Sequence, residues 1–128
     1  MILDTSAILA LVFDEPERDE FIRKISTASS VGVGAPTLVE STIVASARLG
    51  DIGRLHVQGL VSQSGIVVIP FGINHWSAAS DAWARFGRGR HTAALNFGDC
   101  LAYATARLAD RPLLCKGDDF RQTDLQLA

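Results

Sequence analysis

The chain has 128 residues, which suits one domain, and a chain of this size can bury a full core without disulfides or metals. Apolar residues make up 48% of it and the mean hydropathy is +0.21, which excludes a disordered tail. The formal net charge of −2 does not indicate a nucleic-acid partner, although a local basic patch could still bind one.

The two cysteines and the apolar segments bound the class of protein further. Cys100 and Cys115 lie in no CxxC pair and have no histidine cluster near them, so we expect free thiols and neither a disulfide scaffold nor a zinc site. The N-terminus lacks a basic region before its apolar residues, and no apolar run reaches ~18 residues. We therefore expect a cytoplasmic protein that does not enter a membrane.

The first half of the chain alternates short apolar runs with helical patterns. Residues 1–3 are predicted to be a buried strand that stops at Asp4, and a helix over residues 6–13 could be capped by Thr5 or Ser6. A second helix is predicted over residues 14–26, with Pro16 at its first helical position. A strand before Pro36 is followed by two predicted helices, over residues 37–49 and from residue 51 to residue 63.

The second half repeats the alternation. Residues 66–69 are all β-branched and are bounded by Gly65 and Pro70, which predicts a strand, and a helix follows over residues 74–87 with Asn74 as its cap. A loop over residues 88–96 leads to a helix over residues 98–110, a short strand over residues 111–115, and a final loop that could hold a last strand. Short apolar strands alternating with helices predict an α/β fold with a parallel sheet covered on both faces.

Acidic residues follow the predicted strands and helix starts. Asp4 comes after the first strand, Glu40 lies one turn into the helix after the second, Asp99 opens a late helix, and Asp118 and Asp119 follow the last strand. In a parallel sheet these positions lie near the edge formed by the carboxyl ends of the strands. Carboxylates gathered there would repel one another unless a cation compensates, and hard divalent ions such as Mg²⁺ or Mn²⁺ prefer oxygen ligands. The pattern therefore suggests metal-dependent phosphodiester hydrolysis.

Each acid also has a structural interpretation. Asp4 could simply cap the first helix, Asp99 could be a first-turn aspartate favoured by the helix dipole, and Asp118 and Asp119 could be turn residues. Glu40 could lie on a solvated helix face, although its neighbours in sequence are mostly apolar. The functional interpretation depends on their joint placement.

Four segments resemble the motif regions of PIN-domain proteins, in particular the VapC toxins of bacterial toxin–antitoxin pairs. They are MILDTSAIL, PTLVES, LNFGDCLAYATA and LLCKGDDFRQTDL, in family order along the whole chain. The resemblance implies a single PIN domain over residues 1–128, an α/β/α sandwich with a mostly parallel sheet of four to five strands. It also implies a Mg²⁺- or Mn²⁺-dependent ribonuclease toxin, an RNA substrate, a VapB-like antitoxin that blocks the site, and a homodimer or toxin–antitoxin hetero-oligomer.

Carried over by position, the resemblance makes Asp4, Glu40 and Asp99 the first three acids of the site. Asp118 is chosen as the fourth acid. Asp119 remains the alternative, because this segment is shorter than in many family members. Asp4, Asp99 and Asp118 would hold metal, and Glu40 would bind metal or orient the attacking water. Thr5 resembles the hydroxyl residue that the family places beside its first acid, and we expect it to contact substrate.

A basic segment precedes the Asp99 helix. Arg85, Arg88 and Arg90 lie close together in sequence, and Lys116 flanks the last motif, so these side chains could contact RNA phosphates. The alternative is a solvated helix end at which the dipole favours cations. The helices around residues 8–15 and 37–49 carry more apolar residues than one core face needs, which suggests a surface covered by another chain.

Other classes of protein fit less well. A haloacid-dehalogenase phosphatase needs a second acid two residues after the first, where this chain has Ser6. A phospho-accepting receiver module needs an aspartate after its central strand, and the segment VVIPFG supplies none. A protein-binding signalling module in which the acids are only caps remains an alternative, and it predicts no metal-dependent cleavage.

Overall fold

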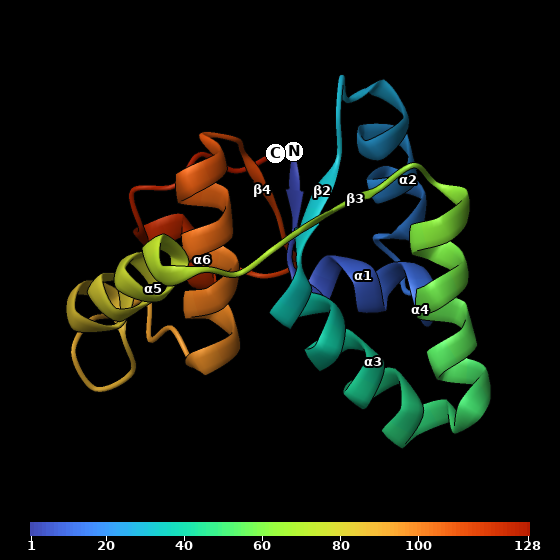
Figure 1. Cartoon of the computed structure of the whole chain (residues 1–128), viewed down its shortest axis with the longest axis horizontal. Helices are drawn as coiled ribbons and strands as arrows, with labels where there is room; N and C mark the ends of the chain where they lie inside the picture. Colours follow the sequence, from blue (N-terminus) through green and yellow to red (C-terminus); the bar gives the residue numbers. More distant parts are fainter.

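The centre of the fold is a sheet of four parallel strands in the order β3-β2-β1-β4 (Figure 1). The computed structural model describes residues 1–128. β1 is a central strand, so Ile2 lies opposite both Gly32 and Leu113. The strands are β1 (Ile2–Leu3), β2 (Gly32–Gly34), β3 (Val67–Ile69) and β4 (Leu113–Leu114).

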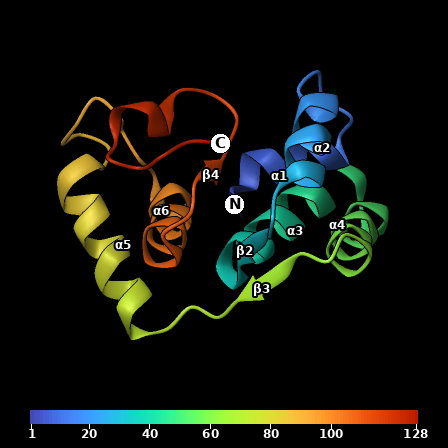
Figure 2. The same cartoon turned by 90° about the horizontal axis from the view of Figure 1, so that it is seen from above.

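Helices cover both faces of this sheet. Figures 1 and 2 show α5 and α6 on one side of the strands and α1 to α4 gathered on the other. The helices are α1 (Thr5–Val12), α2 (Arg18–Thr27), α3 (Ala35–Leu49), α4 (Asp51–Gln63), α5 (Ile73–Phe86) and α6 (Phe97–Ala109). The predicted α/β sandwich with a parallel sheet is thus confirmed, with four strands.

The sheet separates two hydrophobic cores. Because side chains alternate along a strand, Ile2 and Leu113 pack into the core under α5 and α6, whereas Leu3 and Leu114 pack into the core under α1 to α4. Strands of two or three residues can hold the sheet because both faces are buried. The two central strands, β2 and β1, therefore position the residues that follow their carboxyl ends.

Several predicted helix starts are wrong. α3 begins at Ala35, two residues before the predicted start, with Pro36 in its first turn. α2 begins at Arg18 because Pro16 lies in a turn that follows Asp14, whose φ of 56° is incompatible with a continuing helix. α5 begins one residue before the expected cap Asn74. Its N-cap is Gly72, whose backbone N–H donates to Nδ1 of the histidine at the third helical position, 3.3 Å away.

The edge strand and the last segment also differ from expectation. β3 links α4 on one side of the sheet to α5 on the other (Figure 2). Val67 of this strand is 60% exposed instead of covered on both faces. The possible last strand is reduced to one bridge between Leu113 and Leu127, and residues Asp119–Gln122 form a short 3₁₀ helix. None of the helices is long and apolar enough to cross a lipid bilayer.

Candidate active site

Asp4 lies where β1 ends and α1 begins, and only 5% of its surface is exposed. The backbone N–H and the hydroxyl of Ser6 both donate to Asp4 Oδ2, at 3.0 and 2.6 Å. Asp4 is therefore the N-cap of α1, which corrects the expectation that Thr5 or Ser6 caps this helix. Burial raises the pKa of the Asp4 carboxyl above its ordinary range, and the Ser6 hydrogen bonds offset part of that rise.

Ser6 also connects the first acid to the strand on its other side. The backbone N–H of Lys116, just after β4, donates to Ser6 Oγ at 2.8 Å, and the backbone N–H of Asp4 donates to the carbonyl of Leu114 at 3.0 Å. The carboxyl ends of β1 and β4 are thereby joined through one hydroxyl. This arrangement restricts the orientation of the Asp4 carboxylate.

Glu40 reaches the same edge of the sheet from the second turn of α3. The hydroxyl of Thr5 donates to Glu40 Oε2 at 2.6 Å, which links the start of α1 to α3. The carboxylate of Glu40 also lies against Gly98, in the first turn of α6. Thr5, a candidate substrate contact, is thus hydrogen-bonded to the second acid.

Asp99 occupies the third position of α6 and forms a reciprocal capping box with Asn96. Its Oδ2 accepts from the Asn96 N–H at 2.8 Å, and its own N–H donates to Asn96 Oδ1 at 2.9 Å. Burial raises the pKa of Asp99 from 3.8 to about 6, against the lowering effect of the Asn96 N–H. The carboxylates of Asp4, Asp119 and Glu40 raise this pKa further, so four acids share one electrostatic environment.

The late aspartates are separated by the structure. Asp118 is largely exposed and its Oδ1 pairs with Arg121 Nε at 2.8 Å. The charge of Asp119 instead acts on the pKa of Asp99 and on that of Cys115, which burial raises to about 12. Both aspartates are exposed, but the charge of Asp119 reaches Asp99, whereas Asp118 pairs with Arg121, which favours Asp119 as the fourth acid.

The donor set of this site fits a hard divalent cation, since it consists of carboxylate oxygens whose mutual repulsion a cation would relieve. No three of these side chains are close enough to coordinate a single ion directly. Mg²⁺ retains several of its waters when it binds proteins, so part of the contact can be made through water.

Two of the four expected phosphate-binding side chains are already paired within the chain. Arg85 Nη2 lies 2.9 Å from Asp124 Oδ2, which ties α5 to the last segment. Lys116 Nζ lies 2.8 Å from Glu15 Oε2 and 3.1 Å from Glu17 Oε2. Arg85 and Lys116 therefore stabilise the fold around the site in this structure.

Arg88 and Arg90 lie on the loop between α5 and α6. Both are exposed and their side chains make no hydrogen bond or ion pair. The loop ends at Asn96, the cap that holds Asp99, and its Thr92 hydroxyl bonds to Gln122 of the 3₁₀ turn. These two arginines are thus free cations on a loop that joins the acidic cluster.

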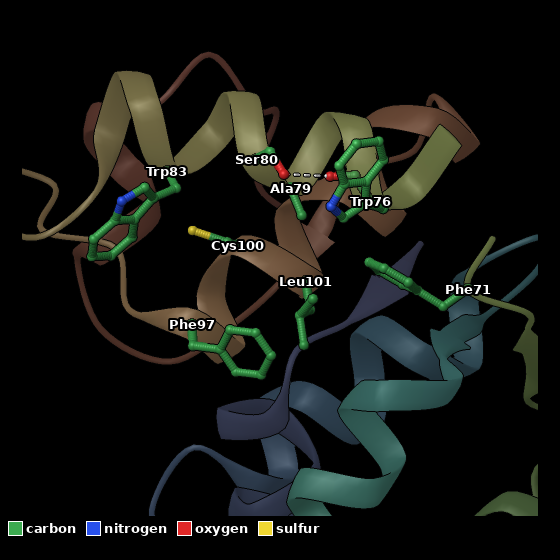
Figure 3. Close-up of a pocket in the computed structure, with 8 residues that line it drawn as sticks. All are labelled: Phe71, Trp76, Ala79, Ser80, Trp83, Phe97, Cys100 and Leu101. Atoms are coloured by element: carbon green, nitrogen blue, oxygen red, sulfur yellow. Dashed lines mark hydrogen bonds between the residues drawn. The ribbon is translucent and has the colours of Figure 1, made fainter. Parts of the chain in front are cut away.

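Beside the acids is an apolar groove, and Trp76 and Trp83 line part of it without entering the core (Figure 3). Trp76 is 64% exposed and Trp83 is 40% exposed, so both remain available on this surface. The groove is continuous with exposed side chains of α3 through Phe97, which is 79% exposed. The large exposed apolar residues of this surface are Val39, Ile43, Val44, Ile73, Trp76, Trp83 and Phe97.

Sequence reasoning missed Gly98 and understated Ser6. Gly98 is a glycine at the start of a predicted helix, one residue before a candidate acid, and because glycine weakens a helix relative to alanine, its presence there points to a packing or functional reason. The sequence indicates Ser6 only as a cap, because its hydrogen bond from the backbone N–H of Lys116 depends on the pairing of β1 with β4.

Comparisons with known proteins show which proteins the chain is similar to. The sequence model of the PIN domain family matches residues 1–125. Ribonuclease VapC36 of Mycobacterium tuberculosis is 46% identical to the chain over 127 residues, which cover 98% of the chain and 91% of that protein. Ribonuclease VapC of Mycolicibacterium smegmatis is 35% identical over 133 residues, which cover 98% of the chain and 97% of that protein.

Solved structures share the fold at low sequence identity. VapC20 of Mycobacterium tuberculosis, described as a Sarcin-Ricin loop cleaving toxin, superposes with a TM-score of 0.81 at 15% identity, covering 99% of this chain and 97% of that one. VapBC2 from Rickettsia felis, solved with a DNA fragment from its promoter, gives a TM-score of 0.79 at 13% identity, covering 99% and 96%. Both chains have the architecture described above along nearly their whole length.

Proposed function

Because the chain belongs to the PIN-domain family, and within it to the VapC ribonucleases, we propose that residues 1–128 form one endoribonuclease domain whose active site is the acidic cluster. The observation that supports this assignment is the electrostatic coupling of four acids, since the carboxylates of Asp4, Glu40 and Asp119 all raise the pKa of Asp99. The raised pKa of Asp99, about 6, reflects burial and the neighbouring carboxylates. Perturbed acids that face one another at such an edge are typical of functional sites.

Divalent metal is the cofactor that this donor set favours, as in the family, and we propose Mg²⁺ or Mn²⁺. Asp4, Asp99 and Asp119 would hold it, directly or through water. When bound, the metal neutralises charge on the scissile phosphate and lowers the pKa of a water molecule.

The residues of the chain do the positioning. Asp4 is buried and held by Ser6, so its carboxylate is available in one orientation. Glu40 is held by Thr5 and can orient the attacking water or accept its proton. Asp99 faces the other acids from the capped start of α6.

Phosphates of single-stranded RNA next to the scissile bond would meet Arg88 and Arg90. These arginines are exposed, unpaired and connected to Asp99 by a short loop. Arg85 and Lys116 contribute less to binding in this proposal, because each is already neutralised by carboxylates.

We propose an antitoxin and a second copy of the chain as partners. The solved structures that share the fold include toxin–antitoxin complexes, among them one from Klebsiella pneumoniae. The exposed apolar surface over α3, α5 and Phe97 is larger than scattered surface residues would make, which is typical of a protein interface. On α1, by contrast, no large apolar side chain is exposed, so this helix contributes little to the apolar surface that another chain could cover.

Cleavage of labelled RNA by the purified chain tests the proposal. We expect cleavage with Mg²⁺ or Mn²⁺, none with EDTA, and recovery when metal is restored. Asp99→Asn should abolish cleavage while circular dichroism shows an unchanged fold, since asparagine can still accept the Asn96 N–H. A protein that cleaved equally well as Asp99→Asn, or in EDTA, would not be a metal-dependent nuclease at this site.

A further inference from the structure

Gly98 lies under the carboxylate of Glu40. A Cβ built on Gly98 would lie 2.5 Å from both Glu40 Oε1 and Oε2, and 2.8 Å from the carboxyl carbon. Side-chain carbons do not approach oxygen atoms this closely without displacing one of them. The absence of a side chain at residue 98 is therefore a condition for the observed position of Glu40.

The backbone offers no other reason for a glycine here. Gly98 is in the first turn of α6 and its φ is not positive, so any residue could adopt its conformation. Glycine weakens a helix relative to alanine, and the rest of α6 contains four alanines. Because a residue that weakens the helix occupies a buried position, its small size is the property that the structure uses.

Thr5 holds the same carboxylate from the opposite helix, through the 2.6 Å hydrogen bond from its hydroxyl to Glu40 Oε2. Glu40 is thus confined between Thr5 of α1 and Gly98 in the first turn of α6. Gly98 immediately precedes Asp99. The partial positive charge of a helix N-terminus also favours a carboxylate at this place.

We propose that Gly98 and Thr5 are positioning residues that together form a seat for the Glu40 carboxylate beside Asp99. The functional meaning of the seat depends on the proposed nuclease function, but its existence does not. An alanine at residue 98 would push the carboxylate out of the cluster, and loss of the Thr5 hydroxyl would leave it free to rotate.

A stability cycle tests the seat without any assay of activity. Gly59 on α4 is the matched control, because a Cβ there would meet only Gln63 Nε2 at 3.8 Å. Gly59→Ala should raise the thermal midpoint, whereas Gly98→Ala should raise it less or lower it. In a Glu40→Ala background the collision is gone, so Gly98→Ala should then raise the midpoint as much as Gly59→Ala. Equal effects of Gly98→Ala in both backgrounds would overturn the seat.

Activity and carboxyl resonances supply the second test. Gly98→Ala and Thr5→Val should each lower kcat at least tenfold with little change in KM for RNA. The two variants should also shift the ¹³C resonance of the Glu40 side-chain carboxyl. Thr5→Ser should keep the wild-type kcat and the wild-type resonance. Unchanged kcat and an unchanged resonance in Gly98→Ala and Thr5→Val would overturn the proposal. A wild-type chain that cleaves no RNA would refute the nuclease function instead, while the stability cycle and the resonance would still decide the seat.

Discussion

Divalent-ion binding to the acidic cluster should weaken as the pH falls from about 7 to about 5, because protons and metal compete for the same carboxylates. The pKa of Asp99 is raised from 3.8 to about 6 in the metal-free fold, mainly by burial. At pH 5 only about a tenth of such a group is ionised, against about nine-tenths at pH 7. The apparent dissociation constant for Mg²⁺ should therefore rise about tenfold over these two pH units, which corresponds to ~1.4 kcal/mol.

The metal-free protein should show the opposite trend. A carboxyl whose pKa is higher in the folded than in the unfolded chain stabilises the fold while it is protonated, below its unfolded value. That contribution is lost as the pH rises through the folded value. For Asp99 the window runs from 3.8 to about 6, and burial of Asp4 acts in the same direction. Because Asp99 is partly exposed, we discount its contribution to about 1–2 kcal/mol.

Thermal unfolding followed by circular dichroism between pH 4 and pH 8 measures both effects. Without metal, the contribution of Asp99 should fall up to about pH 6 and then level off. At a concentration of ten times its dissociation constant, Mg²⁺ should stabilise the fold by ~1.4 kcal/mol near pH 7, or several degrees, and by much less near pH 5. Asp99→Asn serves as the control, since it removes the titration but can keep the capping bond to Asn96.

Two results would contradict this reasoning. One is a Mg²⁺-induced stabilisation of the same size at pH 5 and pH 7.5. The other is an Asp99→Asn variant that retains the wild-type pH dependence, which would mean that another group controls the affinity for metal.

Three further outcomes follow from named contacts. Asp119→Asn should lower cleavage at least tenfold while Asp118→Asn leaves it near the wild-type rate, and the reverse order would restore Asp118 as the fourth acid. Ser6→Ala should lower the free energy of unfolding by about 1–3 kcal/mol, measured by urea denaturation, because the N-cap carboxylate and a backbone N–H after β4 both lose a partner. The double substitution Arg88→Gln and Arg90→Gln should weaken RNA binding. It should also reduce the magnitude of the slope of the logarithm of the binding constant against the logarithm of the salt concentration by about one to two, measured by fluorescence anisotropy with metal chelated. An unchanged salt slope would remove this loop from the RNA surface.

Much of the site could be predicted because it follows local pattern. An aspartate directly after a buried strand and a glutamate within an apolar helix are visible in the sequence, and the parallel sheet places them at one edge. The choice between Asp118 and Asp119 could not be made in this way. A turn of 3₁₀ helix rotates neighbouring residues in different directions, and only the packing of the last segment decides which one faces the cluster.

Residue type and short-range spacing predict the alternation of strands and helices, the absence of an apolar helix long enough to cross a bilayer, and the choice of Asp4, Glu40 and Asp99 as candidate acids. Tertiary structure alone decided which hydrogen bonds hold those acids. The Ser6 hydroxyl accepts from the backbone N–H of Lys116, which is 110 positions away in the sequence. The Thr5 hydroxyl donates to Glu40, which is 35 positions away. Gly98 was an ordinary helix position until α3 placed a carboxylate against it. Contacts between distant segments depend on how the helices pack against the sheet, and no local pattern in the chain encodes them.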